Sequence, residues 1–250
     1  MNSKMHKSQI ELPLMPADSS APVAENRMLP AGMGSLNVLI GFEESQASCI
    51  EFRKLGHNAF SCDLQNCSGG NPQWHLKMDI FEAIKGGVLP IGNNFINDEV
   101  IIYKWDLIIL HAPCTYTALC GNRWYWNSPL RAEGIKLCKD SWDAACAVCD
   151  YVVLEQPKTI MQRYIGKKTQ VIHPWMFGHK EYKETWLWIK GLQPLAETSN
   201  VLKWMIADDR KEYEKVFRMP PGSDRQKLRS KTYPGIAAAF AMQWGGNACR

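Results

Sequence analysis

Short apolar runs alternate along the chain with stretches in which apolar residues recur at helical spacing. Runs of strand length occupy residues 36–41, 58–62, 107–110, 151–154 and 185–189. The run at 107–110 holds four aliphatic residues without interruption, which is typical of a strand in the middle of a parallel sheet covered on both faces. Helical spacing and helix-end signals predict helices at 45–55, 131–149 and 233–244. This order predicts an α/β fold with a mostly parallel sheet and helices on both faces.

The segments between these elements are polar or irregular. Residues 86–97 are rich in Gly, Pro and Asn and predict an irregular surface excursion. Residues 158–168 are basic and predict a partly helical segment, and residues 201–217 predict a charged, mostly solvated helix or helical hairpin.

The length of 250 residues fits one domain with a small appendage. Residues 1–34 are broken by prolines, serines and charges, and predict a disordered segment without a secretory signal. The core is expected at 35–191 and 230–246, with a small insertion region at 192–229.

Composition narrows the class of protein. The hydrophobic content of 46% and the charged content of 22% are ordinary for a soluble globular protein, and no apolar run approaches the roughly 20 residues of a membrane span. Nine irregularly spaced cysteines without an export signal predict free thiols in a reducing cytoplasm. Cys146 and Cys149 lack the second pair that structural zinc requires, so we expect core thiols and no metal. The net charge of +4 permits a polyanionic partner without arguing for one.

Candidate chemistry gathers after the strand at 107–110. Pro113 cannot donate to a ladder, so Cys114 is expected just past the carboxyl end of that strand, the edge where open α/β sheets bind ligands. The next buried strand delivers Glu155 to the same edge, although a strand-end Glu that only caps a turn is the structural alternative. Arg123 and Trp124 follow Cys114 in an aromatic loop, which suits the stacking of exposed bases.

A strand–helix–strand unit at the start of the core predicts a nucleotide-type cofactor site. Asp63 follows Gly41 by about twenty positions, the spacing of such sites. Only Gly41 stands at the turn, however, and the carboxylates of Glu43 and Glu44 would repel a pyrophosphate. They suit a cofactor that carries an ammonium or sulfonium charge, and a generic turn with solvated acids is the alternative.

At these residues the sequence resembles the DNA cytosine-5 methyltransferase family, in a short form of the kind common in phage and prophage genomes. The resemblance runs from about residue 36 to residue 244, with the motifs in the order of the family. The resemblance implies a Rossmann-like S-adenosylmethionine-dependent methyltransferase fold. Its implied S-adenosylmethionine contacts are Gly41, Phe42, Glu43, Asp63, Asp79 and Pro113. Its implied catalytic residues are Cys114 and Glu155. Together with the aromatic loop and a basic run at 218–231, it leads us to expect substrate contacts at Arg123, Trp124, Gln156, Lys183 and Arg229.

The chemistry that the resemblance implies is covalent. A thiolate at Cys114 would add to C6 of cytosine and generate an enamine that attacks the sulfonium methyl. The Cys114 thiol is therefore expected to have a pKa lowered by cationic groups. Glu155 is expected to hold the N3 edge of the ring in its protonated form. The target base must leave the duplex to reach the thiol.

Four departures from the family pattern stand out. The cofactor turn is reduced to Gly41, and Gln156 replaces a shorter Asn. The family's Gln-Arg-Arg-x-Arg segment is replaced by residues 179–185, in which only Lys180 and Lys183 could take the basic role. Only 192–229 is left for target recognition, so sequence selectivity is expected to be low or supplied by a partner protein.

These features predict an S-adenosylmethionine-dependent DNA cytosine-5 methyltransferase in the cytoplasm, the host cytoplasm if the chain is phage-encoded. One alternative is the same chemistry on RNA or a free pyrimidine nucleotide. Another is a catalytically silent methyltransferase-like protein that binds DNA or a host protein. The sequence does not distinguish cytosine from uracil as the target ring.

Overall fold

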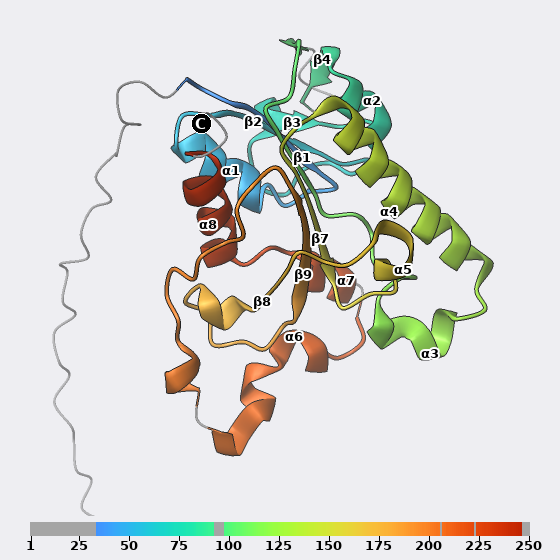
Figure 1. The fold of residues 1–250 in the computed structure, drawn as a ribbon, viewed down its shortest axis with the longest axis vertical. Coiled ribbons are helices and arrows are strands. Elements are labelled where there is room, and N and C mark those ends of the chain that lie inside the picture. Colours follow the sequence, from blue (N-terminus) through green and yellow to red (C-terminus); the bar gives the residue numbers. More distant parts are fainter. Residues whose placement is uncertain (1–33, 93–97, 206, 223, 247–250) are drawn as a thin grey trace, which may run out of the picture.

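The structure, a computed structural model, describes residues 34–92, 98–205, 207–222 and 224–246 (Figure 1). The segment predicted to be disordered, 1–34, lies outside the described residues except for its last one. In the described part, no helix is both long and apolar enough to cross a bilayer.

A seven-stranded sheet forms the centre of the molecule, in the order β3-β2-β1-β6-β7-β9-β8 (Figure 1). The strands are β1 (Asn37–Gly41), β2 (Asn58–Cys62), β3 (His75–Leu76), β6 (Leu107–Leu110), β7 (Val152–Pro157), β8 (Gln170–Ile172) and β9 (Thr185–Lys190). Neighbours from β3 to β7 pair in parallel, whereas β9 is antiparallel to both β7 and β8. The predicted strands are thus confirmed.

Helices cover both faces of the sheet. On one face lie α1 (Ala47–Lys54) and α8 (Pro234–Trp244), and on the other lie α2 (Ile80–Lys85) and α4 (Pro129–Val148) (Figure 1). Because alternate strand residues point to opposite faces, Ile109 packs in a cluster with Phe240 of α8, and Ile108 packs in a cluster with Cys138 of α4. The predicted α/β fold with helices on both faces is confirmed, as are the three predicted helices.

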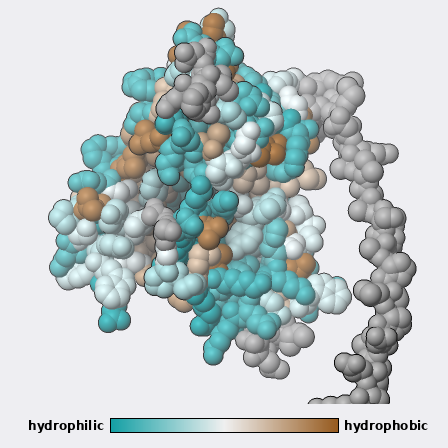
Figure 2. Space-filling model, turned by 180° about the vertical axis from the view of Figure 1, so that it is seen from behind, coloured by the Kyte–Doolittle hydropathy of each residue, from teal (hydrophilic) through white to brown (hydrophobic). Residues whose placement is uncertain are grey.

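The shorter elements lie mostly in the connections. They are α3 (Asn122–Tyr125), α5 (Gln162–Ile165), α6 (Lys215–Arg218), α7 (Arg225–Ser230) and the 3₁₀ turns η1 (Pro72–Trp74), η2 (Leu119–Gly121), η3 (Pro174–Met176), η4 (Leu202–Trp204) and η5 (Ala207–Tyr213). Between 201 and 217 the chain thus forms short turns rather than the predicted helix or helical hairpin. From behind, hydrophobic side chains appear as separate spots among hydrophilic ones (Figure 2).

An antiparallel hairpin replaces the irregular excursion predicted at 86–97. Its strands are β4 (Gly87–Ile91) and β5 (Asp98–Ile102), and 93–97 lies outside the described residues. The prediction was wrong for 87–91 because Gly and Pro do not prevent pairing in a two-stranded hairpin. Pro90 sits in a two-stranded ladder, where a missing donor costs little, and Leu89 and Ile102 bury the inner face.

The order of the strands defines one switch point. From β1 the chain moves outward to β2 and β3, and it then returns to β6 on the other side of β1 and continues to β7. Gly41 pairs with Leu110 and Leu110 pairs with Leu154, so the ends of these three strands lie level. Ligands of open α/β sheets bind outside the carboxyl ends of the strands at such a point.

Candidate functional site

Cys114 lies in a tight turn just after β6, as the sequence predicts. The N–H of His111 donates to the carbonyl of Gly41 at 3.0 Å. This bond extends the hydrogen bonding between β6 and β1 by one residue beyond Leu110. The carbonyl of Cys114 accepts from the N–H of Thr117 at 3.1 Å and of Ala118 at 2.8 Å. The thiol is therefore carried by a fixed turn at the switch point.

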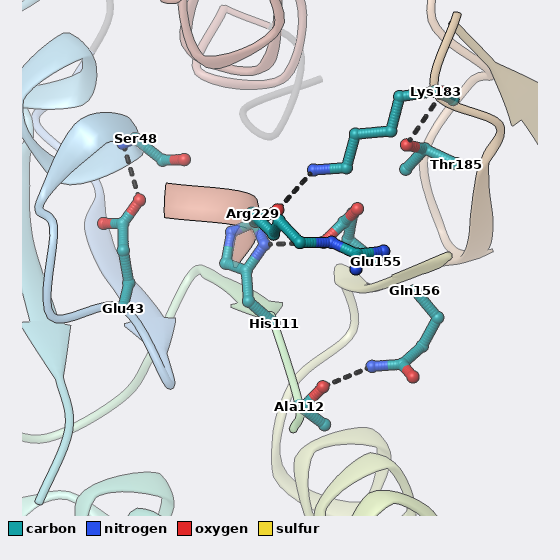
Figure 3. A network of polar contacts seen from close by, with 9 residues as sticks. All are labelled: Glu43, Ser48, His111, Ala112, Glu155, Gln156, Lys183, Thr185 and Arg229. Atoms are coloured by element: carbon teal, nitrogen blue, oxygen red, sulfur yellow. Dashed lines mark hydrogen bonds and ion pairs between the residues drawn. The ribbon is translucent and has the colours of Figure 1, made fainter. Parts of the chain in front are cut away.

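Glu155 lies inside β7 rather than after it. The strand continues to Pro157 because β9 pairs with it up to Thr185, beyond the point where β6 ends. The extension brings Glu155 level with His111, and Nδ1 of His111 lies 3.1 Å from Oε2 of Glu155 (Figure 3). The two side chains are only 8% and 16% exposed, so this is a nearly buried pair.

The two members of this pair stabilise each other's charged form. Burial by itself would raise the pKa of the Glu155 carboxyl, but the hydrogen bond from His111, the His111 charge and Lys183 together hold that pKa below its ordinary value. Burial by itself would lower the pKa of His111, but Glu155 and then Glu43 raise it. In the ligand-free site the ionised form of Glu155 is therefore favoured, and a protonated Glu155 against the N3 edge of a bound ring stays a prediction.

The Cys114 thiol has its pKa raised to about 11, chiefly by burial and then by the charge of Glu155. Lys183 acts in the opposite direction, and Cys120 adds a smaller upward effect. The predicted lowering of this pKa is wrong in the ligand-free site. Burial and the charge of Glu155 outweigh the charge of Lys183.

Lys183 reaches the site from the segment before β9, and α7 lies beside it. Its Nζ donates to the backbone carbonyl of Arg229 at 3.1 Å (Figure 3). Lys227, also on α7, forms an ion pair with Glu44 across 3.6 Å between Nζ and Oε2. The predicted substrate contacts Lys183 and Arg229 thus lie together, joined through the Arg229 backbone. Through Lys183 and Lys227, α7 connects the β9 side of the site with the turn after β1.

Gln156 is buried and supports the site from inside the fold. The residue is 1% exposed, and its Nε2 donates to the carbonyl of Ala112, immediately before Pro113 and Cys114. The Gln156 side chain thus anchors the turn that carries the thiol. Its Oε1 is buried and has no partner among the described residues.

The turn after β1 has an unusual backbone. Phe42 and Gln46 both have φ near +60°, at 61° and 59°, and they are the two non-glycine residues with positive φ among the described residues. The Glu43 carboxylate accepts from the N–H of Ser48 at 2.7 Å and of Cys49 at 3.2 Å, and so caps α1 (Figure 3). Glu43, predicted to contact the cofactor, is therefore engaged inside the fold.

Gly41 is closely packed by side chains. A Cβ at this position would lie 2.5 Å from Cδ1 of Ile80 and 2.8 Å from Cδ2 of Leu110. The glycine therefore lets α2 approach the end of β1, which is sufficient to explain it without a ligand.

Two carboxylates lie at the ends of the next two strands. Oδ1 of Asp63 accepts from the N–H of Gln65 at 2.9 Å, and Oδ1 of Asp79 accepts from the N–H of Phe81 at 2.8 Å. Burial is the main cause that raises the pKa of the Cys62 thiol to about 12, and the charges of Asp63 and Asp79 add to it. Both carboxylates therefore lie near that thiol. Within the described ranges, the second oxygen of each carboxylate has no hydrogen-bond partner.

The aromatic loop after Cys114 is open to solvent. Trp124 and Trp126, on and just after α3, are 75% and 66% exposed. The guanidinium of Arg123 lies 5.4 Å from the ring centroid of Trp124. Gly121 brings the loop back against the carbonyl of Thr115, where a Cβ would lie at 3.1 Å. The loop therefore presents a cationic and aromatic surface close in sequence to the thiol.

No group of three or more His, Cys, Asp or Glu side chains placed to hold a metal ion occurs among the described residues. The Cys149 thiol donates to the carbonyls of Trp105 at 3.3 Å and Tyr151 at 3.2 Å. It serves to hold the end of α4 against the sheet.

His111 is the functional candidate that sequence reasoning missed. It directly follows the buried strand and precedes the Pro-Cys turn, and this position at the sheet edge was the available signal. Its partner comes from 44 residues later in the chain. Comparison with known protein families finds none that the chain matches, and no curated protein matches it either. Its function must therefore be argued from the site.

Proposed function

We propose that the protein transfers a methyl group from S-adenosylmethionine to C5 of cytosine in DNA, through a covalent adduct with Cys114. One observation carries the proposal. A thiol and a buried carboxylate, Cys114 and Glu155, come from adjacent strands to the switch point of the sheet, close enough for the charge of Glu155 to raise the thiol pKa. Nucleophilic addition to a pyrimidine needs this combination.

Each side chain has a defined task in the proposed reaction. Cys114 loses its proton to water and bonds to C6 of the ring, which makes C5 electron-rich. The Lys183 charge favours the thiolate, as its lowering effect on the thiol pKa indicates. Glu155 faces the N3 edge and supplies the hydrogen bond that stabilises the adduct. Gln156 keeps the turn in place through Ala112.

The residues at the β1, β2 and β3 ends fit S-adenosylmethionine in part. Bound there, the cofactor would supply an electrophilic methyl group. The unpartnered carboxylate oxygens of Asp63 and Asp79 fit its hydroxyl and amino groups, and the half-buried Phe42 lies beside them at the next strand end. Glu43 is occupied by the cap of α1, so we assign it no direct contact with the cofactor.

A duplex DNA substrate fits the exposed loop. Trp124 and Trp126 offer stacking surfaces, and Arg123 adds a positive charge. The insertion at 192–229 forms only short turns and helices, which fits low sequence selectivity or selectivity supplied by a partner protein. The eight cysteines of the described part are free, as suits a reducing cytoplasm.

A second candidate is a catalytically silent methyltransferase-like protein that binds DNA or another protein. The raised pKa of Cys114 favours it, because at pH 8 a pKa of about 11 leaves about one thiol in a thousand ionised. The same chemistry on RNA or a free pyrimidine nucleotide remains compatible with the small insertion region.

The test is transfer of labelled methyl from S-adenosylmethionine to unmethylated duplex DNA, with wild type beside Cys114→Ser and Cys138→Ser. Cys138 is a buried thiol of α4 and serves as the matched control. We expect label with wild type and Cys138→Ser and none with Cys114→Ser. Full activity of Cys114→Ser would eliminate the covalent mechanism. Absence of label with every protein, together with retained DNA binding, would favour the silent binding protein.

A further inference from the structure

His111 is enclosed by charged groups from three directions. Glu155 of β7 contacts its Nδ1, Glu43 of the β1–α1 turn acts on it by charge, and Lys183 opposes them from the segment before β9. On α8, the ring of Phe240 stacks on the imidazole with 6.5 Å between centroids and presents no charge. Among the described residues, Nε2 of His111 has no hydrogen-bond partner. In the described part of the chain, the contact between Nδ1 and Glu155 is therefore the one hydrogen bond that holds this ring.

The proposed reaction needs a proton at N3 of the ring. When the thiolate adds to C6, electrons move toward N3, and a proton delivered there neutralises the charge. Glu155 faces N3 but is held ionised by His111, so it has no proton of its own to give. The nearest store is the imidazolium, 3.1 Å away.

We propose that His111 holds the proton that Glu155 passes to N3 of the target cytosine. The inference rests on the proposed function. His111 acts through Glu155 and is a positioning residue that also stores the proton, whereas Glu155 touches the substrate.

The step balances. Cys114 Sγ, already deprotonated to water, forms the bond to C6, and the electron pair of the ring's C5–C6 double bond moves through the ring toward N3. Glu155 donates a proton to N3 and receives the Nδ1 proton of His111, which becomes neutral. C5 then takes the methyl group of S-adenosylmethionine, with the thioether as leaving group, and N3 returns its proton to Glu155, which returns one to His111. Water removes the proton from C5, the electron pair of that C–H bond restores the C5–C6 double bond, and Cys114 leaves C6 as a thiolate. Apart from the methyl donor, no oxidant or further reactant is consumed.

The arrangement has a kinetic signature. The rate depends on a deprotonated Cys114 and a protonated His111 together. It rises with pH until His111 titrates and is then flat, because the gain in thiolate cancels the loss of imidazolium. Without an imidazolium the rate would instead keep rising about tenfold per pH unit toward the thiol pKa of about 11.

His111→Asn tests this prediction, because the Asn amide can donate a hydrogen bond from the place of Nδ1 but cannot carry an extra proton. The matched control is His173→Asn, since His173 also follows a strand directly, in this case β8, away from the pair. Methyl transfer to duplex DNA is measured from pH 6 to pH 9, with kcat and KM separated. For His111→Asn we expect kcat at pH 6 to fall by about 10²–10³-fold, KM for DNA to change less than about threefold, and the flat region to disappear. His173→Asn should keep the wild-type profile.

A second measurement needs no turnover. The His111 imidazole is titrated by NMR in the wild type and in Glu155→Gln, where we expect its pKa to fall because the carboxylate is gone. An active wild type together with an unchanged rate and pH profile in His111→Asn would overturn the inference and leave the proposed function intact. An unchanged His111 titration in Glu155→Gln would overturn it as well. An inactive wild type whose His111 titration responds would overturn the proposed function and the inference with it, and would leave only the coupling of His111 to Glu155.

Discussion

Gly235→Ala is a sharp test of how α8 meets the rest of the fold. A Cβ on Gly235 would lie 2.0 Å from the backbone carbonyl oxygen of Phe177 and 2.9 Å from Nε2 of His179. Ordinary contact begins near 3.4 Å, so the start of α8 must move away by about 1.4 Å (3.4 − 2.0). The obstacle is backbone, which cannot rotate out of the way as a side chain can.

The expected loss of stability follows from three terms. Forced displacement in a packed region costs about 1–3 kcal/mol, and the hydrogen bond from the Gly235 N–H to His179 Nε2, now 2.9 Å long, is worth about 1 kcal/mol. The better helix propensity of Ala returns up to about 1 kcal/mol. We therefore expect the free energy of unfolding to fall by about 2 kcal/mol and Tm to fall by about 4–8 °C in a chain of this size.

The assay is thermal and urea unfolding followed by circular dichroism, with Gly222→Ala as the matched control. A Cβ at Gly222 meets nothing within 4 Å, so that variant should match the wild type or gain up to about 1 kcal/mol. If Gly235→Ala unfolded at or above the wild-type temperature while the control behaved as expected, the close approach of α8 to Phe177 would be refuted.

Three further predictions concern the site. Gln156→Leu should change the free energy of unfolding by less than about 1 kcal/mol, because the lost bond to Ala112 is offset by removal of the unpartnered Oε1, yet it should lower methyl transfer by about 10²-fold in the labelled-methyl assay. Iodoacetamide labelling of Cys114 across pH, read by peptide mass spectrometry, should give a thiol pKa near 11, and a lower one in Glu155→Gln because a nearby negative charge is gone. Urea melts should show the largest stability difference between wild type and His111→Asn from pH 4.5 to pH 6.5. These limits are the ordinary pKa values of the Glu155 carboxyl and the His111 imidazole. The difference should shrink above that window as His111 loses its raised-pKa proton, and below it as Glu155 gains one.

The elements that the sequence predicts correctly are those with a local signal. The uninterrupted run at 107–110 is β6, and the glycine after α1 closes that helix, because burial and backbone freedom act at the residues themselves. The hairpin of β4 and β5 was missed because it depends on the pairing of two segments and on the burial of Leu89 and Ile102 in the core. Nothing within residues 86–97 alone reveals that partner.

The candidate site shows the same division. The places of Cys114 and Glu155 at one edge follow from the order of the strands and were predictable. Their protonation was not, because it depends on His111, on the extension of β7 by β9, and on how deeply the surrounding elements bury the thiol. The role of Gln156 was not predictable either. Its side chain is long enough to reach the carbonyl of Ala112, and it therefore anchors the turn instead of contacting the substrate.

Part of the rise in the Cys114 pKa and the lowered pKa of the Glu155 carboxyl belong to one charge arrangement. The Glu155 charge, stabilised by His111, is the cause after burial that raises the pKa of Cys114, and Lys183 lowers that pKa. If Glu155 shares a proton with N3 of a bound ring, its repulsion of the thiolate weakens while the Lys183 charge remains. Under the proposed function, binding of the base would therefore itself favour the thiolate, and the thiol would stay protonated and slow to react with other electrophiles when no base is bound.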